Sequence, residues 1–255
     1  MSATRRRKLL LSYAPDWIIT ILLGLRHPYA VHERVPTFAL VLICFVAPLL
    51  IQPVINLLSI RSWWDLHNAT LGLILSLAMA GVVTQFTKVT VGRPRPDVID
   101  RCQPRSGTID PTFGLSTAAI CTQTDLSLLK DGFRSFPSGH SSLSFAGLGF
   151  LAFYVAGKLH LFDHKGHIGK VWLFLAPFSG AALVAISRTM DYRHHWQDVF
   201  IGSILGTVMA HILQELRVSL KYYLCITVIN TAKRPRFRRG RVHQMGLFQD
   251  LTQGH

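Results

Sequence analysis

The stretch FPSGHSS, residues 136–142, joins a polar segment to a long apolar run and places a histidine where that run begins. Pro137 and Ser138 predict the start of a helix, with Ser138 as its N-cap, because serine is favoured at that position. The first backbone N–H groups of a helix have no partner within it, so together with the helix dipole they attract anions. Gly139 would let a ligand approach the backbone closely. The stretch therefore predicts an anion site at the start of a helix, with His140 beside it.

The apolar run that follows is one of several that are long enough to cross a lipid bilayer. The chain has 255 residues, of which 49% are hydrophobic and 16% are charged, and its mean hydropathy is +0.32. These values are too apolar for an ordinary soluble domain. Residues 9–25 form a short candidate span, and stretches near the ~20 residues that a crossing needs occupy residues 38–60, 69–91, 141–161, 171–186 and 199–213. We therefore predict an all-α, polytopic membrane helix bundle of about six transmembrane helices, the first one short.

The net charge of +14 comes from basic residues gathered at the N-terminus, in residues 158–170 and in the C-terminal tail. A basic chain can bind the phosphates of nucleic acid, but this distribution is the one that the positive-inside rule predicts for the cytoplasmic face of a membrane protein. We therefore expect the membrane bilayer as a partner and no nucleic acid. Residues 1–220 are predicted to form one membrane-embedded domain, and residues 221–255 a basic, disordered cytoplasmic tail.

Two polar regions of the chain, residues 88–140 and 187–198, are predicted to lie on the same face of the membrane. Two predicted helices separate them, so the chain crosses the bilayer and returns between the first region and the second. With residues 158–170 and the tail in the cytoplasm, the shared face is lumenal or extracellular. The organelle is left open among the vacuole, the Golgi and the endoplasmic reticulum. Cys102 and Cys121 both lie on this face. The sequence leaves open whether they form a disulfide or stay two free thiols.

The stretch KVTVGRPRP, residues 88–96, brings two cations to this face. Lys88 ends a predicted helix, and Pro94 and Pro96 prevent the helix from continuing, so Arg95 is held just beyond it. An ammonium group and a planar guanidinium together suit the oxygens of a phosphate. The alternative is that both side chains are interfacial anchors whose apolar stems extend from the helix end.

The stretch SRTMDYRHHWQD, residues 187–198, carries a possible histidine nucleophile. In a first helical turn His194 and Asp198 share one face, so the carboxylate can accept a hydrogen bond from the imidazole. Such a bond fixes the tautomer and leaves the other ring nitrogen free to attack phosphorus. His195 is a rival at three residues' spacing, and Asp198 could instead serve only as a carboxylate that stabilises the start of a helix. Local geometry leaves the choice between the two histidines open.

His140 could complete the chemistry by donating a proton to a departing oxygen beside a bound phosphate. The alternative is an interfacial polar residue with no chemical role. No CxxC pair and no Cys/His spacing typical of a metal site occurs in the sequence.

Taken together, the three stretches resemble the tripartite signature of the type 2 phosphatidic acid phosphatase superfamily. The matching patterns are Lys-x6-Arg-Pro at residues 88–96, Pro-Ser-Gly-His at 137–140 and Ser-Arg-x5-His-x3-Asp at 187–198. The flanking segments APDWIITI and GRPRPDVIDRC are similar to those of fungal lipid phosphate phosphatases of the diacylglycerol pyrophosphate phosphatase type. The resemblance extends to about residue 220 and implies an integral membrane phosphatase with a vanadium-haloperoxidase-like core.

The resemblance also implies a role for each matched residue. His194 would be the nucleophile that forms a phosphohistidine, Asp198 would orient it, and His140 would be the general acid. The residues that would hold the phosphoryl oxygens are Lys88, Arg95, Ser138, Gly139 and Arg188. Enzymes of this kind need no divalent metal, so neither a metal nor another cofactor is expected.

The implied function is removal of the terminal phosphate from diacylglycerol pyrophosphate, phosphatidate or lysophosphatidate. One alternative is a phosphatase for sphingoid-base phosphate or polyprenyl diphosphate, which would use the same site. Another is a non-catalytic lipid-binding relative. The presence of His140, His194 and Asp198 argues against the second alternative, because headgroup capture needs cations but no nucleophile.

Overall fold

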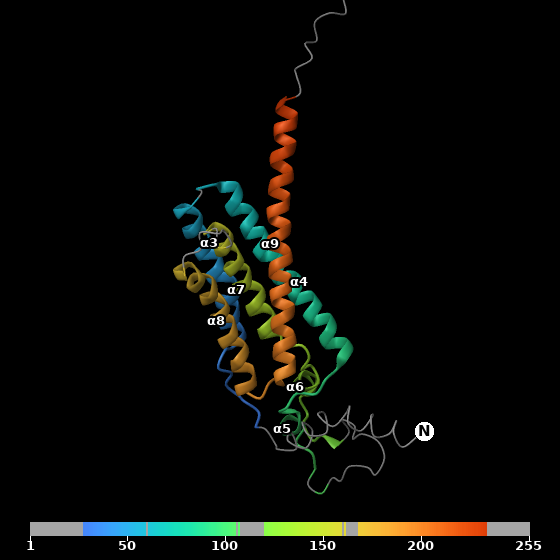
Figure 1. The fold of residues 1–255 in the computed structure, drawn as a ribbon. Helices are drawn as coiled ribbons and strands as arrows, with labels where there is room; N and C mark the ends of the chain where they lie inside the picture. The colour runs from blue at the N-terminus through green and yellow to red at the C-terminus, as the bar shows by residue number, and fades with distance from the viewer. Residues whose placement is uncertain are drawn as a thin grey trace, which may run out of the picture. The chain divides into compact units, whose positions relative to one another are not determined.

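The regular secondary structure of the described residues is helical, apart from an isolated β-bridge between Pro104 and Cys121. In this computed structural model, residues 28–59, 61–105, 107, 120–159, 161 and 168–233 are described, with side chains as far as 219. The elements, shown in Figure 1, are α2 (Thr37–Val41), the π-helical turn η1 (Leu42–Val46), α3 (Ala47–Leu58), α4 (Trp63–Val91), α5 (Val98–Cys102), α6 (Leu126–Gly132), α7 (Gly139–Lys158), α8 (Ile168–Met190) and α9 (Trp196–Lys233).

Four helices of the described residues are long and apolar enough to cross a membrane. They are Thr37–Leu58, which joins α2, η1 and α3, and Trp63–Val91, Gly169–Met190 and Trp196–Ser219. The predicted all-α, polytopic membrane bundle is confirmed, although the helices extend beyond several of the predicted ends. The short first helix predicted at residues 9–25 lies outside the described residues.

The predicted span at residues 141–161 is helix α7, which is not among these four helices and lies at the centre of the bundle. It packs against α8, α4, η1 and α3, and most of its residues from Ser141 to Ala156 are buried. Small residues allow this close packing: a Cβ at Gly147 would collide with the Cys44 carbonyl, and one at Gly206 of α9 would collide with the Ser142 carbonyl. Helix backbones therefore approach each other directly, as at the small-residue interfaces of membrane helices.

Helix α4 ends where the sequence predicts. Gly92 adopts a left-handed conformation with φ of 60°, and its N–H donates to the carbonyl of Lys88. A glycine in this conformation is a common helix terminator. Lys88 thus lies in the last turn of α4, at the end of the bundle where α7 begins.

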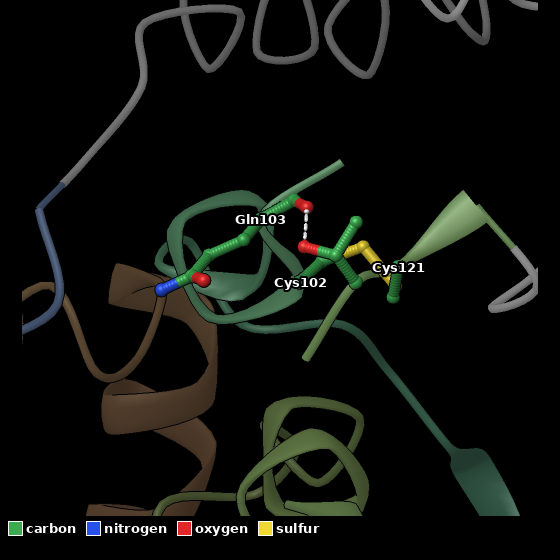
Figure 2. The surroundings of a disulfide bond; sticks show 4 residues. Cys102, Gln103 and Cys121 are labelled. Carbon is green, nitrogen blue, oxygen red and sulfur yellow. Dashed lines mark hydrogen bonds between the residues drawn. A yellow bond between two sulfur atoms is a disulfide. The ribbon is translucent and has the colours of Figure 1, made fainter. Parts of the chain in front are cut away.

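The segment between α4 and α7 contains two short helices and a disulfide. The sequence analysis left open whether this disulfide forms. Cys102 at the end of α5 is bonded to Cys121 (Figure 2), and Thr122 Oγ1 donates to the carbonyl of Gln103, 2.5 Å away. Asp125 caps α6 by accepting from the N–H groups of Ser127 and Leu128. The described parts of the segment between α4 and α7 are therefore held by two short helices, a disulfide and a helix cap.

The predicted division of the chain at residue 220 falls inside a helix. Helix α9 begins at Trp196 and continues to Lys233, well past the predicted end at residue 213. Residues 234–255, which include all five arginines of the predicted basic tail, lie outside the described residues. The proposed boundary stays a prediction.

The close packing of α7 and α9 can be tested with one methyl group. Gly206→Ala should lower the free energy of unfolding by about 1–3 kcal/mol, because the added carbon overlaps the backbone of α7. Gly81→Ala is the matched control, since its new Cβ would lie 3.9 Å from Leu143 Cδ2, an ordinary contact. Thermal unfolding in detergent measures both variants. Equal midpoints for the two would contradict the packing.

Candidate active site

The three sequence motifs meet at the end of the bundle where α7 begins. A Cβ on Gly139 would lie 3.5 Å from Lys88 Nζ, so the first and second motifs are in contact. The N–H of Ser138 donates to the carbonyl of Asp198 over 3.0 Å, which joins the second motif to the third. The residues predicted from the sequence are therefore brought together at helix ends, as expected: Lys88, Arg95, Ser138, Gly139, His140, Arg188, His194 and Asp198.

Ser138 is the N-cap of α7, as predicted. Its backbone is extended, and its hydroxyl accepts from the N–H of Ser141. It is fully buried, together with Ser141. The helix start is thus fixed in place beside the third motif.

Ser135, which directly precedes the second motif, joins the first motif to the third, although the sequence analysis did not identify it. Its N–H donates to the carbonyl of Arg93 in the first motif over 2.9 Å. Its carbonyl accepts from Nδ1 of His194 over 2.7 Å, and its hydroxyl donates to Oδ2 of Asp198. Ser135 is completely buried, so water does not compete for these hydrogen bonds.

The hydrogen bond from His194 to Ser135 determines the tautomer of the imidazole. A carbonyl oxygen can only accept, so Nδ1 carries the proton and Nε2 carries the lone pair. Burial, with the positive charges of Arg95 and Lys88, lowers the pKa of His194 well below 6.5. The ring is therefore neutral at physiological pH, with a nucleophilic nitrogen close to two cations.

The predicted hydrogen bond between His194 and Asp198 is replaced by a different arrangement. Nδ1 of His194 lies 4.0 Å from Oδ2 of Asp198 and is bonded to Ser135 instead. The reason is that α9 begins at Trp196, so His194 precedes the helix and the i, i+4 geometry does not apply to it. Asp198 reaches back to accept from the backbone N–H of His195 over 3.2 Å, as the third residue of a helix does in a capping box.

Asp198 is shared among several donors, and Ser135 links its carboxylate to His194. Its Oδ1 accepts from Nη1 of Arg93 over 2.7 Å, and Nδ1 of His195 lies 3.3 Å from its Oδ2. His195 is thus the histidine paired with the carboxylate. The positive charges of Arg95 and Lys88, in contrast, act on His194.

The two cations of the first motif differ in their partners. Nη2 of Arg95 is 2.8 Å from Oδ1 of Asp131, while its Nε is buried and has no hydrogen-bond partner among the described residues. Lys88 is half-buried and forms no ion pair with the described carboxylates. A buried donor without an acceptor is unfavourable, so both groups have capacity for an anionic ligand.

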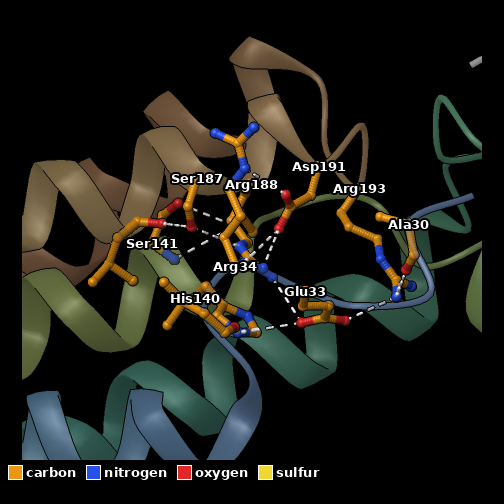
Figure 3. Close-up of polar contacts among 12 residues, drawn as sticks. Ala30, Glu33, Arg34, His140, Ser141, Ser187, Arg188, Asp191 and Arg193 are labelled. Atoms are coloured by element: carbon orange, nitrogen blue, oxygen red, sulfur yellow. Dashed lines mark hydrogen bonds and ion pairs between the residues drawn. The ribbon is translucent and has the colours of Figure 1, made fainter. Parts of the chain in front are cut away.

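Arg188 and His140 are both in contact with residues that precede α2 (Figure 3). Nη1 of Arg188 donates to Glu33 over 2.8 Å and Nη2 donates to Asp191 over 3.0 Å. Nε2 of His140 lies 3.1 Å from the carbonyl of Val35 and 3.9 Å from Oε2 of Glu33. The sequence analysis did not identify Glu33, because nothing in the local pattern links it to residues more than 100 positions away.

One arginine in the segment between α4 and α7 has a structural role. Arg101 is 2% exposed and pairs with Asp97 and Asp131 over 2.9 Å each. Its guanidinium also lies 4.6 Å from the ring centre of Tyr29. The charge of Arg101 is therefore neutralised inside the protein.

An apolar cavity of about 680 Å³ lies between α7, α8 and α9. Its lining includes Phe145, Ile186, Phe200 and Ile204, and it reaches Thr189 and Trp196, which are close in sequence to Arg188 and His194. In the described part of the chain, no three His, Cys, Asp or Glu side chains are grouped so that they could hold a metal ion.

Comparison with known proteins identifies close relatives of this chain. Lipid phosphate phosphatase 2 of Arabidopsis thaliana is 43% identical over 190 residues, covering 74% of this chain and 64% of the relative. Diacylglycerol pyrophosphate phosphatase 1 of Saccharomyces cerevisiae is 44% identical over 193 residues, covering 74% and 66%. The probable diacylglycerol pyrophosphate phosphatase 1 of Schizosaccharomyces pombe is 42% identical over 190 residues, covering 73% and 66%. The chain thus spans just under two thirds of the length of these relatives.

The family comparison covers the part of the chain that carries all three motifs. The model of the PAP2 superfamily matches residues 69–220, from the second turn of α4 into α9. This range includes Lys88, His140, His194 and Asp198, and it leaves out Glu33. The chain belongs to the PAP2 superfamily, as its three motifs and its membrane helices predict.

Proposed function

We propose that this protein is a metal-independent lipid phosphate phosphatase that acts through a phosphohistidine at His194. The observation that carries the proposal is the setting of that ring. Its proton is fixed on Nδ1 by the Ser135 carbonyl, and its neutral form is favoured by burial and by Arg95 and Lys88. These are the properties of a nitrogen nucleophile placed beside a binding site for an anion.

In the first step, Nε2 of His194 attacks phosphorus and the bond from phosphorus to the leaving oxygen breaks. His140 donates a proton to that oxygen, so the alcohol or phosphate departs in its protonated form. The positive charge that develops on His194 is stabilised through Ser135, which in turn is bonded to Asp198. A covalent phosphohistidine and a neutral His140 remain.

In the second step, water attacks the phosphohistidine and the phosphorus–nitrogen bond breaks. His140, now neutral, accepts a proton from the attacking water, as microscopic reversibility requires. Inorganic phosphate leaves, and both histidines return to their starting states. No redox partner or cofactor takes part.

The charge of the transferring phosphoryl group would be stabilised by cations and by a helix end. Lys88, Arg95 and Arg188 supply the positive charge, and the N-terminus of α7, which is capped by Ser138 and begins at Gly139, adds the positive end of the helix dipole. The unpartnered Nε of Arg95 supports this assignment. Such a set performs the electrostatic task that Mg²⁺ performs in other phosphoryl-transfer enzymes.

The proposed substrates are diacylglycerol pyrophosphate, phosphatidate and lysophosphatidate. The names of the relatives support this class, and a site at helix ends suits a headgroup whose acyl chains stay in the bilayer. The apolar cavity between α7, α8 and α9 offers room for one of those chains close to the site. Sphingoid-base phosphate and polyprenyl diphosphate would fit the same phosphoryl site and differ only in the apolar part.

We further propose that the site faces the lumen or the exterior. The disulfide between Cys102 and Cys121 supports this orientation, because such bonds persist in oxidising compartments. The basic C-terminal tail would then lie in the cytoplasm.

His194→Ala should reduce phosphate release from phosphatidate by about 10⁴-fold or more, because it removes the nucleophile. His195→Ala should slow the reaction but retain measurable turnover, since His195 contacts Asp198 and not the substrate. Both rates are measured with purified protein in mixed micelles. The opposite order, with His195→Ala inactive and His194→Ala active, would show that the nucleophile is His195 and contradict the proposal.

Removal of divalent metals should leave the activity unchanged. Purified protein in excess EDTA is expected to release phosphate from diacylglycerol pyrophosphate at the rate seen without chelator, because cationic side chains hold the phosphoryl group. Loss of activity in EDTA that Mg²⁺ restores would contradict the proposal. Lipid binding without phosphate release in either condition would indicate the non-catalytic alternative.

The orientation is tested in sealed microsomes. A protease added outside should remove an epitope tag placed after His255, because the basic tail is expected in the cytoplasm. The loop that contains the disulfide should be protected until detergent is added. A tag that resists the protease in sealed microsomes and is cleaved after detergent would reverse the orientation.

A further inference from the structure

The segment that precedes α2, residues 29–35, crosses the site and is anchored at several points. The ring of Tyr29 lies between two guanidinium groups, with Arg101 and Arg193 each 4.6 Å from its centre. The N–H of Tyr29 donates to Asp100 over 2.7 Å, and the N–H of Arg34 donates to Asp191 over 3.0 Å. We call this segment the strap. The strap is held by α5 and by the turn between α8 and α9.

Two groups of the strap lie against the proposed general acid. The carbonyl of Val35 is 3.1 Å from Nε2 of His140. Oε2 of Glu33, which Figure 3 shows beside His140, is 3.9 Å from the same nitrogen. The carboxylate is fixed in place by two buried arginines, Arg188 over 2.8 Å and Arg193 over 3.0 Å. Glu33 is therefore a partly buried negative charge held rigidly beside His140.

The contact with Val35 determines which nitrogen of His140 can give up a proton. Because the carbonyl only accepts, Nε2 must carry a proton in both the neutral and the charged ring. Nδ1 has no hydrogen bond among the described residues, so the transferable proton belongs on Nδ1. Donating it would return the ring to the neutral tautomer that the structure shows.

This general acid must be charged before it donates, and burial, followed by most of the charges near His140, opposes that state. Arg188 from α8, Lys88 from α4 and His194 from the turn before α9 surround the site, and the charges of the first two disfavour a cationic imidazole. Glu33 on the strap acts in the opposite direction. A carboxylate close to an imidazole stabilises its protonated form.

We propose that Glu33 is a positioning residue for the general acid: its carboxylate stabilises the protonated state of His140, while Val35 fixes the orientation of the ring. This inference rests on the proposed phosphatase function and adds a partner that lies outside the matched family region, residues 69–220. The strap is then a working part of the site and not only its cover.

The test compares two substrates whose leaving groups differ in how much they need a proton from the general acid His140. Phosphatidate expels an alkoxide, which must be protonated as it leaves, whereas p-nitrophenyl phosphate expels a phenolate that needs little help. Glu33→Gln keeps the side-chain length and an oxygen for Arg188 but removes the charge. Its kcat should fall about 10- to 100-fold on phosphatidate and less than about threefold on p-nitrophenyl phosphate.

The ratio of the two rates is independent of how much of the preparation is folded, so a partly unstable variant still gives an answer. His32→Ala is the control on the strap, because His32 is exposed and is not one of its anchors; it should leave both rates unchanged. Equal losses on both substrates in Glu33→Gln would overturn the inference while the phosphatase function stands. A wild-type protein that releases phosphate from neither substrate would instead overturn the proposed function.

Discussion

The hydrogen bonds of Ser135 hold the candidate active site together. One buried residue bonds to the first motif through its N–H, to His194 through its carbonyl and to Asp198 through its hydroxyl. Since its carbonyl fixes the proton of His194 on Nδ1, the same contact that joins the motifs also determines which ring nitrogen can react. The orientation of the proposed nucleophile is therefore set by the backbone, and Asp198 acts on it through Ser135.

Charge balance explains why so many arginines can be buried at one end of the bundle. Arg95 and Arg101 are paired with Asp131, and Arg188 is paired with Asp191 and Glu33. A buried charge without a partner would be costly. Lys88 and the Nε of Arg95 are left with capacity for another anion. A bound phosphoryl group would complete the balance.

The sequence predicted the membrane helices and the meeting of the motifs, because both follow from local patterns and from counting crossings. The capping role of Ser138 was equally local and is confirmed. The expected bond between His194 and Asp198 was wrong because the spacing rule assumed a helix that begins only at Trp196. Ser135 and Glu33 could not be predicted, since their contacts join residues 42 to 160 positions apart. No periodicity in the sequence records such contacts.

The most direct measurement of this account is the chemical identity of the trapped intermediate. Protein quenched during turnover of phosphatidate labelled with ³²P on its phosphate should carry an acid-labile phosphate on His194. Because Nδ1 is bonded to the carbonyl of Ser135, ³¹P NMR and peptide mapping should place the phosphate on Nε2. Phosphate on Nδ1 of His194, or on any other side chain, would contradict the arrangement on which the mechanism depends.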